Sequence, residues 1–520
     1  MQAVAEGGLA ASAAAIFART SFGPLDWAIV CVYLLISVGI GIYARSFVRT
    51  MDDFVVAKRS VRTALGVASM SSTELGLITV MYSAQKGFVG GFAAFHIAVV
   101  AAAVTLVVGL TGFLVVRLRA YRVLTIPEFY EKRFGRRTRV LGGTVLALAG
   151  ILNMGMFLKV ESMFIVAVTG MEPGATLTAV MVILMSLALL YTVFGGMVSD
   201  MVTDYLQFVV LAFGLLAACW FAVREVGWDH AFQAVAALKG EAGFNPVAAE
   251  GAFGPSYVVW MSFLGLVSCA IWPTAVARAL AADSEKTVKR IYTWSSIGFL
   301  ARFLMPYFLG ICALVWVTEQ PELKAVFFPS RPGAPALDNL YALPVFLSHI
   351  LPAGIIGIVV AAMLAALMST YDSYFLTWSS VITQDVVAPL TGNRIGTRAR
   401  LLLTRLLMVA IGLYLVYWGL FYKGRDDIWD YMAVSGAIYF TGAFAVLLGG
   451  LYWKRASSTG ATLAILSGCS AVLGLSPVQD LLGVKWPSAW VGLATVAASV
   501  VTMVAGSLLF PDRPTVRRTQ

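Results

Sequence analysis

The sequence predicts an all-α integral membrane protein, and three observations lead to this fold class. Apolar residues make up 60% of the chain, charged residues make up 12%, and the mean hydropathy is +0.85. A soluble domain carries about 25% charged residues, so about half of that charge is absent. The apolar residues recur in runs of about 20, the length of a helix that crosses a hydrocarbon core of about 30 Å. Because the runs are continuous rather than alternating, helices are favoured over the strands of a barrel.

We predict about 13 transmembrane helices from these runs. The run at 343–380 is too long for one perpendicular crossing, so we expect it to tilt or to extend beyond the bilayer. The expected spans are residues 25–45, 65–87, 93–116, 140–168, 175–197, 202–222, 256–280, 291–317, 343–380, 401–421, 430–452, 458–476 and 488–510.

The basic residues indicate the orientation of the chain. Lys and Arg number 37 against 27 Asp and Glu, which gives a formal net charge of +10. They flank the expected spans, which is typical of membrane topology and argues against a nucleic-acid partner. With the N-terminus outside and an odd number of spans, most of them fall on the inner side, including eight between residues 117 and 139. We therefore expect a multi-pass protein of the plasma (inner) membrane, embedded in lipid, with a cytoplasmic C-terminus.

The sequence favours neither an enzyme nor a cofactor protein. Residues 1–20 have no basic stretch ahead of their apolar run, so no cleaved signal peptide is expected. The five cysteines show no CxxC spacing and the three histidines are scattered, which argues against a disulfide framework or a metal cluster. The sequence contains no HExxH motif or phosphate loop. We expect no cofactor, and the oligomeric state stays open.

Two expected spans are interrupted. The second contains the polar run SMSSTE at 69–74, followed by Gly76, and the seventh contains Pro273, which lacks a backbone donor. Five spans separate the interruptions, as in transporters built from two inverted repeats that bind ligands at their broken helices. We therefore expect an inverted-repeat (5+5) core with two discontinuous helices. Its divisions are 1–63 (an extra helix and inner loop), 64–224 (first repeat), 225–452 (second repeat, with outer connections at 224–255 and 319–341) and 453–520 (extra helices and tail).

Oxygen-bearing side chains cluster at the end of the ninth expected span. Ser369, Thr370, Asp372 and Ser373 follow a run of small residues. Small residues and hydroxyls alone would favour close helix packing. With a carboxylate among them, the cluster also suits a hard cation, which prefers oxygen ligands. We favour the cation site.

Several ionisable residues lie at apparent membrane depth, where a charge requires a partner or a function. Lys159 and Glu161 are two residues apart on one helix and point to different sides, so they cannot simply neutralise each other. Structural pairing with other helices and contact with a ligand are equal alternatives for these two. The full set is Glu74, Lys159, Glu161, Asp204, Arg302 and Asp372.

Several segments resemble the sodium/solute symporter family. They are MDDFVVAKRS at 51–60, TIPEFYEKRFG at 125–135, the YT, GG and TD..Q pattern at 191–207, and GLYWKR followed by GA at 450–461. The similarity runs from the first expected span to the eleventh, and the order of the segments makes it specific. It implies sodium-coupled symport of a small solute, with sodium as the coupling ion and the only metal.

The resemblance also implies the ion ligands. Some members hold a second sodium ion, which here points to Asp204 with Ser369 and Ser373. Asp372 stands where those members have a serine, so its carboxylate could tighten this site or replace the ion with a proton. The residues that match the main sodium site are Ser72, Leu75 and Ala366 through their carbonyls, and Ser369 and Thr370 through their hydroxyls.

The expected substrate pocket is more charged than a sugar site. Arg302 matches a lysine that contacts sugar in a galactose-transporting member, and Pro273 and Arg278 share a spacing with the proline transporter. If Arg302 binds a carboxylate and Glu74 an ammonium, the solute is an amino acid or another organic acid. If the two pair with each other, a neutral sugar or polyol fits. We favour the first. The expected pocket residues are Glu74, Lys159, Glu161, Pro273 and Arg302.

Two further alternatives remain. Proton-coupled symport on the same scaffold would place protons on Asp204, Asp372 and Glu74. A membrane sensor that reports a solute without moving it is less favoured, because such proteins usually carry a signalling domain after the helices and only a short tail follows the last expected span.

Overall fold

The computed structural model describes residues 12–44, 59–172, 174–193, 197–330, 336–422 and 427–512. Across these ranges the chain is helical, and the one strand-like feature is an isolated bridge between Val61 and Ala282. The all-α prediction is confirmed. Parts of the segments used above, at 51–58 and 195–196, and the tail at 513–520 lie outside the described residues.

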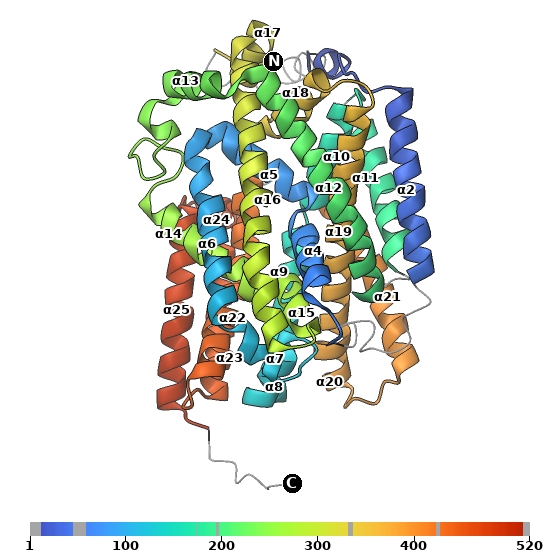
Figure 1. Cartoon of the computed structure of the whole chain (residues 1–520). Helices are drawn as coiled ribbons and strands as arrows, with labels where there is room; N and C mark the ends of the chain where they lie inside the picture. The colour runs from blue at the N-terminus through green and yellow to red at the C-terminus, as the bar shows by residue number, and fades with distance from the viewer. Residues whose placement is uncertain are drawn as a thin grey trace.

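The helices form an elongated bundle (Figure 1). The first half of the core contains α4 (Thr63–Glu74), α5 (Leu77–Gly90), α6 (Phe95–Thr111), α9 (Arg136–Met154), α10 (Phe157–Val168), α11 (Ala175–Thr192) and α12 (Met197–Val226). The second half contains α14 (Pro255–Ala270), α15 (Pro273–Ala281), α16 (Glu285–Glu319), α18 (Ala342–Ile350), α19 (Ile355–Val381), α21 (Thr397–Phe421) and α22 (Ile428–Tyr452). The peripheral helices are α2 (Pro24–Ala44) before the core, and α23 (Ser458–Gly468), α24 (Ser476–Leu482) and α25 (Ser488–Leu509) after it.

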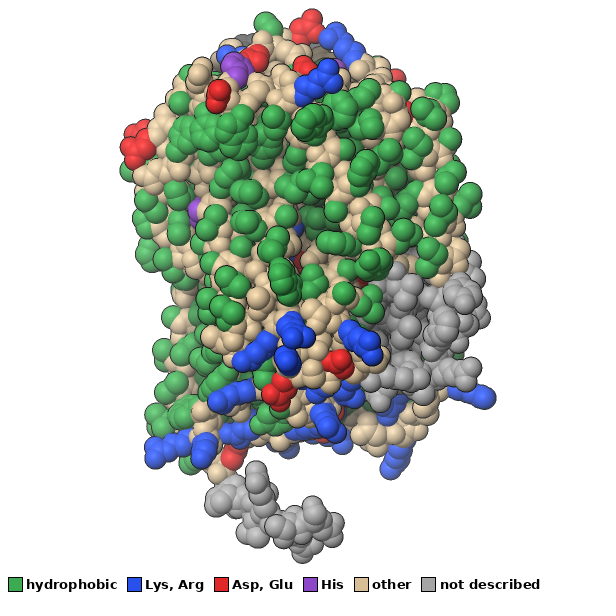
Figure 2. Space-filling view, in the orientation of Figure 1, with side chains coloured by type: hydrophobic (Ala, Val, Ile, Leu, Met, Phe, Trp, Pro, Cys, Tyr) green, Lys and Arg blue, Asp and Glu red, His purple; other side chains and the backbone are tan. Residues whose placement is uncertain are grey.

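Short helices cover the two ends of the bundle. At one end lie α13 (Trp228–Lys239) and α17 (Pro321–Phe327), within the two long connections predicted at 224–255 and 319–341 (Figure 1). At the opposite end lie α7 (Val115–Ala120), α8 (Ile126–Phe134) and α20 (Ala388–Leu390). Lys and Arg side chains gather at this second end (Figure 2), where α7 and α8 carry basic residues in their last turns. We refer to it as the basic end.

Long apolar helices make this a multi-pass membrane protein. Among the described residues, 9 helices are long and apolar enough to cross a membrane, or up to 10 if the bent pair formed by 458–474 and α24 is one span. Two shorter apolar helices occur at Pro24–Ser37 and Thr176–Leu190. The predicted number of about 13 spans stays a prediction.

Both predicted helix interruptions are present. The first lies between α4 and α5, where Leu75 leaves the helical conformation (φ −110°, ψ 67°) and Gly76 is extended. The second lies between α14 and α15, and Pro273 is the first residue of α15, a position at which its missing N–H has no helical partner to lose. The discontinuous helices of an inverted-repeat core are therefore confirmed.

The segment 343–380 differs from the single span, tilted or extending beyond the bilayer, that the sequence predicts. It divides into the short α18 and the long α19, which are separated at Leu351–Gly354. Pro352 cannot continue the first helix, and Gly354 adopts a positive φ of 87° before α19 begins. As a result α19 packs along α12, α2 and α4 as one buried central helix.

Candidate functional site

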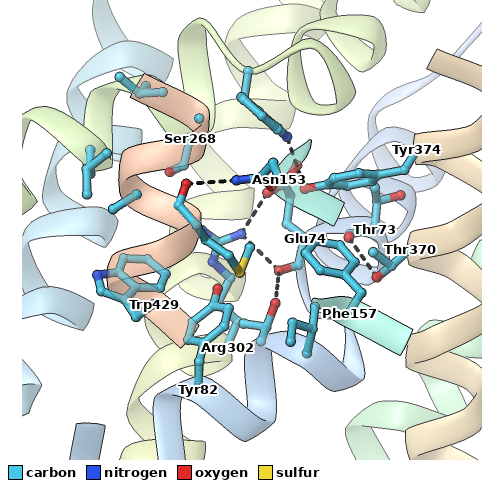
Figure 3. Close-up of a pocket in the computed structure, with 18 of the residues that line it drawn as sticks. Thr73, Glu74, Tyr82, Asn153, Phe157, Ser268, Arg302, Thr370, Tyr374 and Trp429 are labelled. Carbon is cyan, nitrogen blue, oxygen red and sulfur yellow. Dashed lines mark hydrogen bonds and ion pairs between the residues drawn. The ribbon is translucent and has the colours of Figure 1, made fainter. Parts of the chain in front are cut away.

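A cavity of about 100 Å³ lies between the two helix interruptions. We call it the central cavity. Its polar lining comes from α4, α5, α9, α14, α16 and α19, and aromatic and aliphatic side chains complete its walls (Figure 3). The lining includes Thr73, Glu74, Thr79, Tyr82, Asn153, Phe157, Ser268, Trp272, Arg302, Thr370, Tyr374, Trp429 and Phe440.

Glu74 and Arg302 form a buried ion pair at the wall of this cavity (Figure 3). Nη1 of Arg302 lies 2.9 Å from Oε2 of Glu74 and also donates to the Glu74 carbonyl at 3.0 Å, at the open C-terminal end of α4. Thr274 donates to Oε1 of Glu74 at 2.8 Å, so α15 is tied to α4. The rings of Phe299 and Phe303 lie 4.1 and 4.3 Å from the guanidinium carbon. Of the two alternatives that the sequence left open for Glu74 and Arg302, the structure thus shows the one in which they pair with each other.

Two polar atoms of the central cavity have no hydrogen-bond partner. One is Nε of Arg302, and the other is Oδ1 of Asn153; both are buried. The amide nitrogen of Asn153 donates to the Met432 carbonyl at 2.7 Å. A carbonyl oxygen can only accept, so this bond identifies the nitrogen of the amide, and Oδ1 is the atom without a partner. An unused donor and an unused acceptor therefore belong to two residues, on different helices, that line the cavity.

The first interruption lies directly against α19. Oγ of Ser72 donates to Oγ of Ser369 at 3.0 Å, and Oγ1 of Thr370 lies 3.4 Å from the Thr73 carbonyl. A Cβ on Gly76 would lie only 2.3 Å from Oγ1 of Thr370, so only glycine permits this approach. The structure thus brings together Ser72, Ser369 and Thr370. Leu75 lies at the interruption itself, and Ala366 lies one helical turn before Ser369 and Thr370.

Asp204 belongs to a second polar cluster beside the first. Its carboxylate accepts hydrogen bonds from Ser69 at 2.6 Å and from Ser369, and Thr73 lies 3.3 Å away. Arg278 joins this cluster: its Nη2 lies 3.1 Å from Oδ2 of Asp204, and both residues are buried. The cluster is therefore built from α4, α12, α15 and α19 and contains a fixed positive charge.

Arg278 is the residue whose part in this cluster the sequence did not predict. Its Nη2 also donates to Thr73 at 2.5 Å and to Ser373 at 2.8 Å, and its Nε donates to Ser69 at 3.1 Å. The sequence indicated Arg278 only through a spacing. Its depth within the expected span 256–280 is the signal that would have placed it with the other buried ionisable residues.

The remaining predicted residues lie in other places. Asp372 hydrogen-bonds to Thr192 of α11, and Ser373 faces Arg278. Lys159 lines a separate cavity of about 200 Å³ with Asp338, and Pro273 lines a small one of about 40 Å³ with Arg278. Glu161 is fully buried, and neither of its carboxylate oxygens has a hydrogen-bond partner. The structure thus does not place Lys159, Glu161 and Pro273 on the wall of the central cavity.

The central cavity is covered toward the end opposite the basic end. The rings of Tyr82 and Trp429 lie 4.6 Å apart and join α5 to α22. One helical turn further along α5, Nζ of Lys86 lies 2.8 Å from Asp427 and 3.1 Å from Asp430. These contacts hold the outer part of the first broken helix against α22.

A model of the sodium:solute symporter family matches residues 54–468. The chain belongs to this family. It is 24% identical over 485 residues to the sodium/glucose cotransporter of Vibrio parahaemolyticus, which covers 87% of this chain and 85% of the relative. It is 23% identical over 471 residues to the sodium/proline symporter of Staphylococcus aureus (strain Newman), with 85% and 84% covered.

The fold agrees with this membership. The structure of a Na⁺-coupled sialic acid symporter matches the symporter described here with a TM-score of 0.79 at 19% identity, over 95% of this chain and 100% of that chain. Membership supports sodium-coupled symport as the class of activity. The relatives are named for a sugar and for an amino acid, so they leave the choice of solute to the chemistry of the central cavity.

Proposed function

We propose that this symporter moves a small organic solute with a carboxylate group, an amino acid in first place, together with sodium. The main support is the unused edge of Arg302 in the central cavity, where Nη1 holds Glu74 and Nε is buried without a partner. A guanidinium offers five donors in a planar fork, and its Nε side suits a planar carboxylate. Glu74 would stay paired on the other side, so the solute would not meet an uncompensated acid.

The ammonium group of an amino acid would also find partners in this cavity. Oδ1 of Asn153 is a buried acceptor without a donor, and an ammonium group carries three donors. Trp272 and Trp429 line the same space, and the face of an indole ring attracts a cation. Arg302 would thus bind the carboxylate of a zwitterion, and Asn153 would bind its ammonium group.

The sodium ion would bind at the first interruption, with Ser72, Leu75, Ala366, Ser369 and Thr370 as ligands. The contacts between α4 and α19 described above support this choice. A bound ion would hold α4 in the position at which Glu74 and Thr73 line the central cavity. Sodium and solute would then favour each other through one conformational equilibrium, and this coupling is reciprocal.

The basic end would face the cytoplasm, because basic residues concentrate on the inner side of membrane proteins. Sodium would then enter from the end at which α13 and α17 lie. The membrane potential contributes about 2.3 kcal/mol per charge per 100 mV. One charge moved inward down a potential of that size corresponds to a solute ratio of a few tens.

The sodium site is tested by the variant Ser369→Ala with Thr370→Ala. In proteoliposomes, we expect the sodium concentration for half-maximal uptake to rise at least about tenfold, which corresponds to about 1.4 kcal/mol of lost ion binding. Ser379→Ala is the matched control, because the Ser379 hydroxyl bonds to the Phe375 carbonyl within α19 itself. Sodium dependence equal to that of the control would remove this site from the mechanism.

The solute is tested by thermal unfolding of the purified protein with amino acids, other carboxylates and sugars, each with sodium and with potassium. A ligand that binds only the folded state raises the unfolding temperature. We expect the largest rise with one amino acid and sodium present together. A rise only with sugars would contradict the proposed solute class while leaving the sodium site standing.

A neutral sugar or polyol is the second candidate solute. The observation that favours it is the Glu74–Arg302 pair, which leaves the central cavity without net charge.

Proton coupling is the second candidate for the ion. Uptake driven by a pH gradient in sodium-free buffer would establish it.

A further inference from the structure

A cavity of about 750 Å³ lies at the basic end, apart from the central cavity. We call it the lateral cavity. It is surrounded by α6, α7, α14, α16 and the end of α22, and it shares no lining residue with the central cavity. Most of its wall is aliphatic and consists of Ala103, Val104, Val107, Val108, Val116 and Leu266.

The lateral cavity opens onto a surface that faces lipid. Val107 in its wall is 56% exposed, and Leu106 and Leu110 beside it on α6 are exposed as well. α6 belongs to a helical segment that is long and apolar enough to cross a membrane, so these side chains meet hydrocarbon. An acyl chain can therefore enter the lateral cavity from the side.

Two cations line the lateral cavity at the basic end, Arg117 and Lys289. Nη1 of Arg117 donates to the Leu451 carbonyl at 2.9 Å, and its guanidinium carbon lies 4.0 Å from the centre of the Tyr452 ring. The end of α22 thus holds this side chain in place. Lys289 lies across the end of α6, because a Cβ on Gly112 would be only 3.0 Å from its Cε.

The two cations are not neutralised by an acid. In the part of the chain that the structure describes, no ion pair involves Arg117 or Lys289, although Glu285 also lines the lateral cavity. Two positive charges therefore face one negative charge where an aliphatic cavity meets the membrane surface. Basic pockets between membrane helices on the cytoplasmic side are typical binding places for anionic lipid headgroups.

We propose that the lateral cavity binds an anionic phospholipid, with its phosphate between Arg117 and Lys289 and an acyl chain along Val104, Val107 and Val108. The aliphatic cavity is far larger than a phosphate ion, so its occupant needs apolar chains. The phosphate would join α7, in the first half of the core, to α16 in the second half. This inference is independent of the solute and of the coupling ion.

The first experiment is thermal unfolding of the full-length protein in a neutral detergent. Phosphatidylglycerol, phosphatidylcholine or glycerol 3-phosphate is added at the same concentration. A ligand of the folded state raises the unfolding temperature, and we expect this rise with phosphatidylglycerol alone. An equal rise with phosphatidylcholine would overturn the requirement for an anion. An equal rise with glycerol 3-phosphate would replace the lipid site with a site for free phosphate esters.

The charged part of the site is tested by Arg117→Gln combined with Lys289→Gln. Phosphatidylglycerol binding is titrated by native mass spectrometry, and we expect its Kd to rise by about tenfold or more, because each cation near the membrane surface contributes about fivefold. The matched control combines Lys286→Gln with Arg290→Gln, which removes the same charge from exposed residues of α16 outside the cavity lining. An equal rise for the control would reduce the effect to general surface attraction and overturn the site.

The apolar part is tested by Ala103→Phe, which fills the lateral cavity and leaves every charge in place. We expect about tenfold weaker binding of phosphatidylglycerol, equivalent to about two methylene groups that lose their burial. Val99→Phe is its control, because Val99 is exposed on α6 and does not line the cavity. Equal affinities for these two variants would overturn the inference, and this comparison decides the question if the charge variant does not fold.

Discussion

At the scale of single residues, two buried arginines of this symporter use their donors differently. Arg302 holds Glu74 with one nitrogen and leaves Nε unused in the central cavity. Arg278 uses both Nε and Nη2 on the oxygens around Asp204. A planar fork can divide its donors in this way, whereas an ammonium group acts as a point charge. The first arginine thus keeps one donor without a partner, and the second is held by the oxygens around it.

The variant Arg302→Lys tests this division. Lysine keeps the charge beside Glu74 but lacks the Nε edge, so a carboxylate solute should lose a charge-assisted contact of about 1.5–3 kcal/mol. We expect the KM for the solute to rise by about tenfold to a hundredfold, with the sodium dependence little changed. Solute uptake is measured at saturating sodium. An unchanged KM would mean that the solute does not contact this edge.

At the scale of helices, α5 is pressed closely against α16. A Cβ on Gly310 would lie 2.0 Å from the Ala84 carbonyl, and a Cβ on Gly87 would lie 2.1 Å from the Tyr307 carbonyl. These glycines let the two backbones meet, which is a common means of helix association in membranes. The contact positions α5, with Tyr82, at the edge of the central cavity.

Gly310→Ala should therefore destabilise the protein, although alanine is the better helix former. We expect a loss of about 1–3 kcal/mol from the forced separation of α5 and α16, seen as a lower unfolding temperature in detergent. Gly39→Ala on α2 is the matched control, because nothing lies within 4 Å of a Cβ there. Equal unfolding temperatures for the two variants would show that the helices separate without cost.

At the scale of the whole molecule, a buried lysine and two half-buried acids close the central cavity toward the end opposite the basic end. Lys86 joins α5 to Asp427 and Asp430 at α22, above the contact between Tyr82 and Trp429. A half-buried acid that loses its cation is only partly compensated by solvent, and two such acids repel each other. Removal of Lys86 should therefore separate the two helices at this end and open the cavity there.

Lys86→Gln tests this closure. In a background without the native cysteines, a cysteine at Ser268, which lines the central cavity, is exposed to a thiol reagent that cannot cross the membrane. We expect the labelling rate from the outer side to rise at least about tenfold, as the closed state loses about 1.4 kcal/mol or more. Arg19→Gln, which removes an exposed ion pair with Glu322 at the same end, should leave the rate unchanged. A rate equal to that of this control would contradict the closure.

Local sequence determined the fold class, the two helix interruptions and the family of this symporter. These features depend on apolar run length, on Gly76 and Pro273, and on ordered motifs, all of which act within a short stretch of chain. The sequence also predicted that Ser72, Ser369 and Thr370 belong to one site. This prediction was possible because matching positions in related chains occupy matching places in the fold.

Only the tertiary structure decided which buried charges meet. It paired Glu74 with Arg302, directed Asp372 toward Thr192, and divided the segment 343–380 into two helices. It also placed Arg278 among the oxygens around Asp204, which are contributed by helices far apart in the chain. The direction of a long side chain and the approach of helices distant in sequence depend on packing, and packing is a property of the folded bundle.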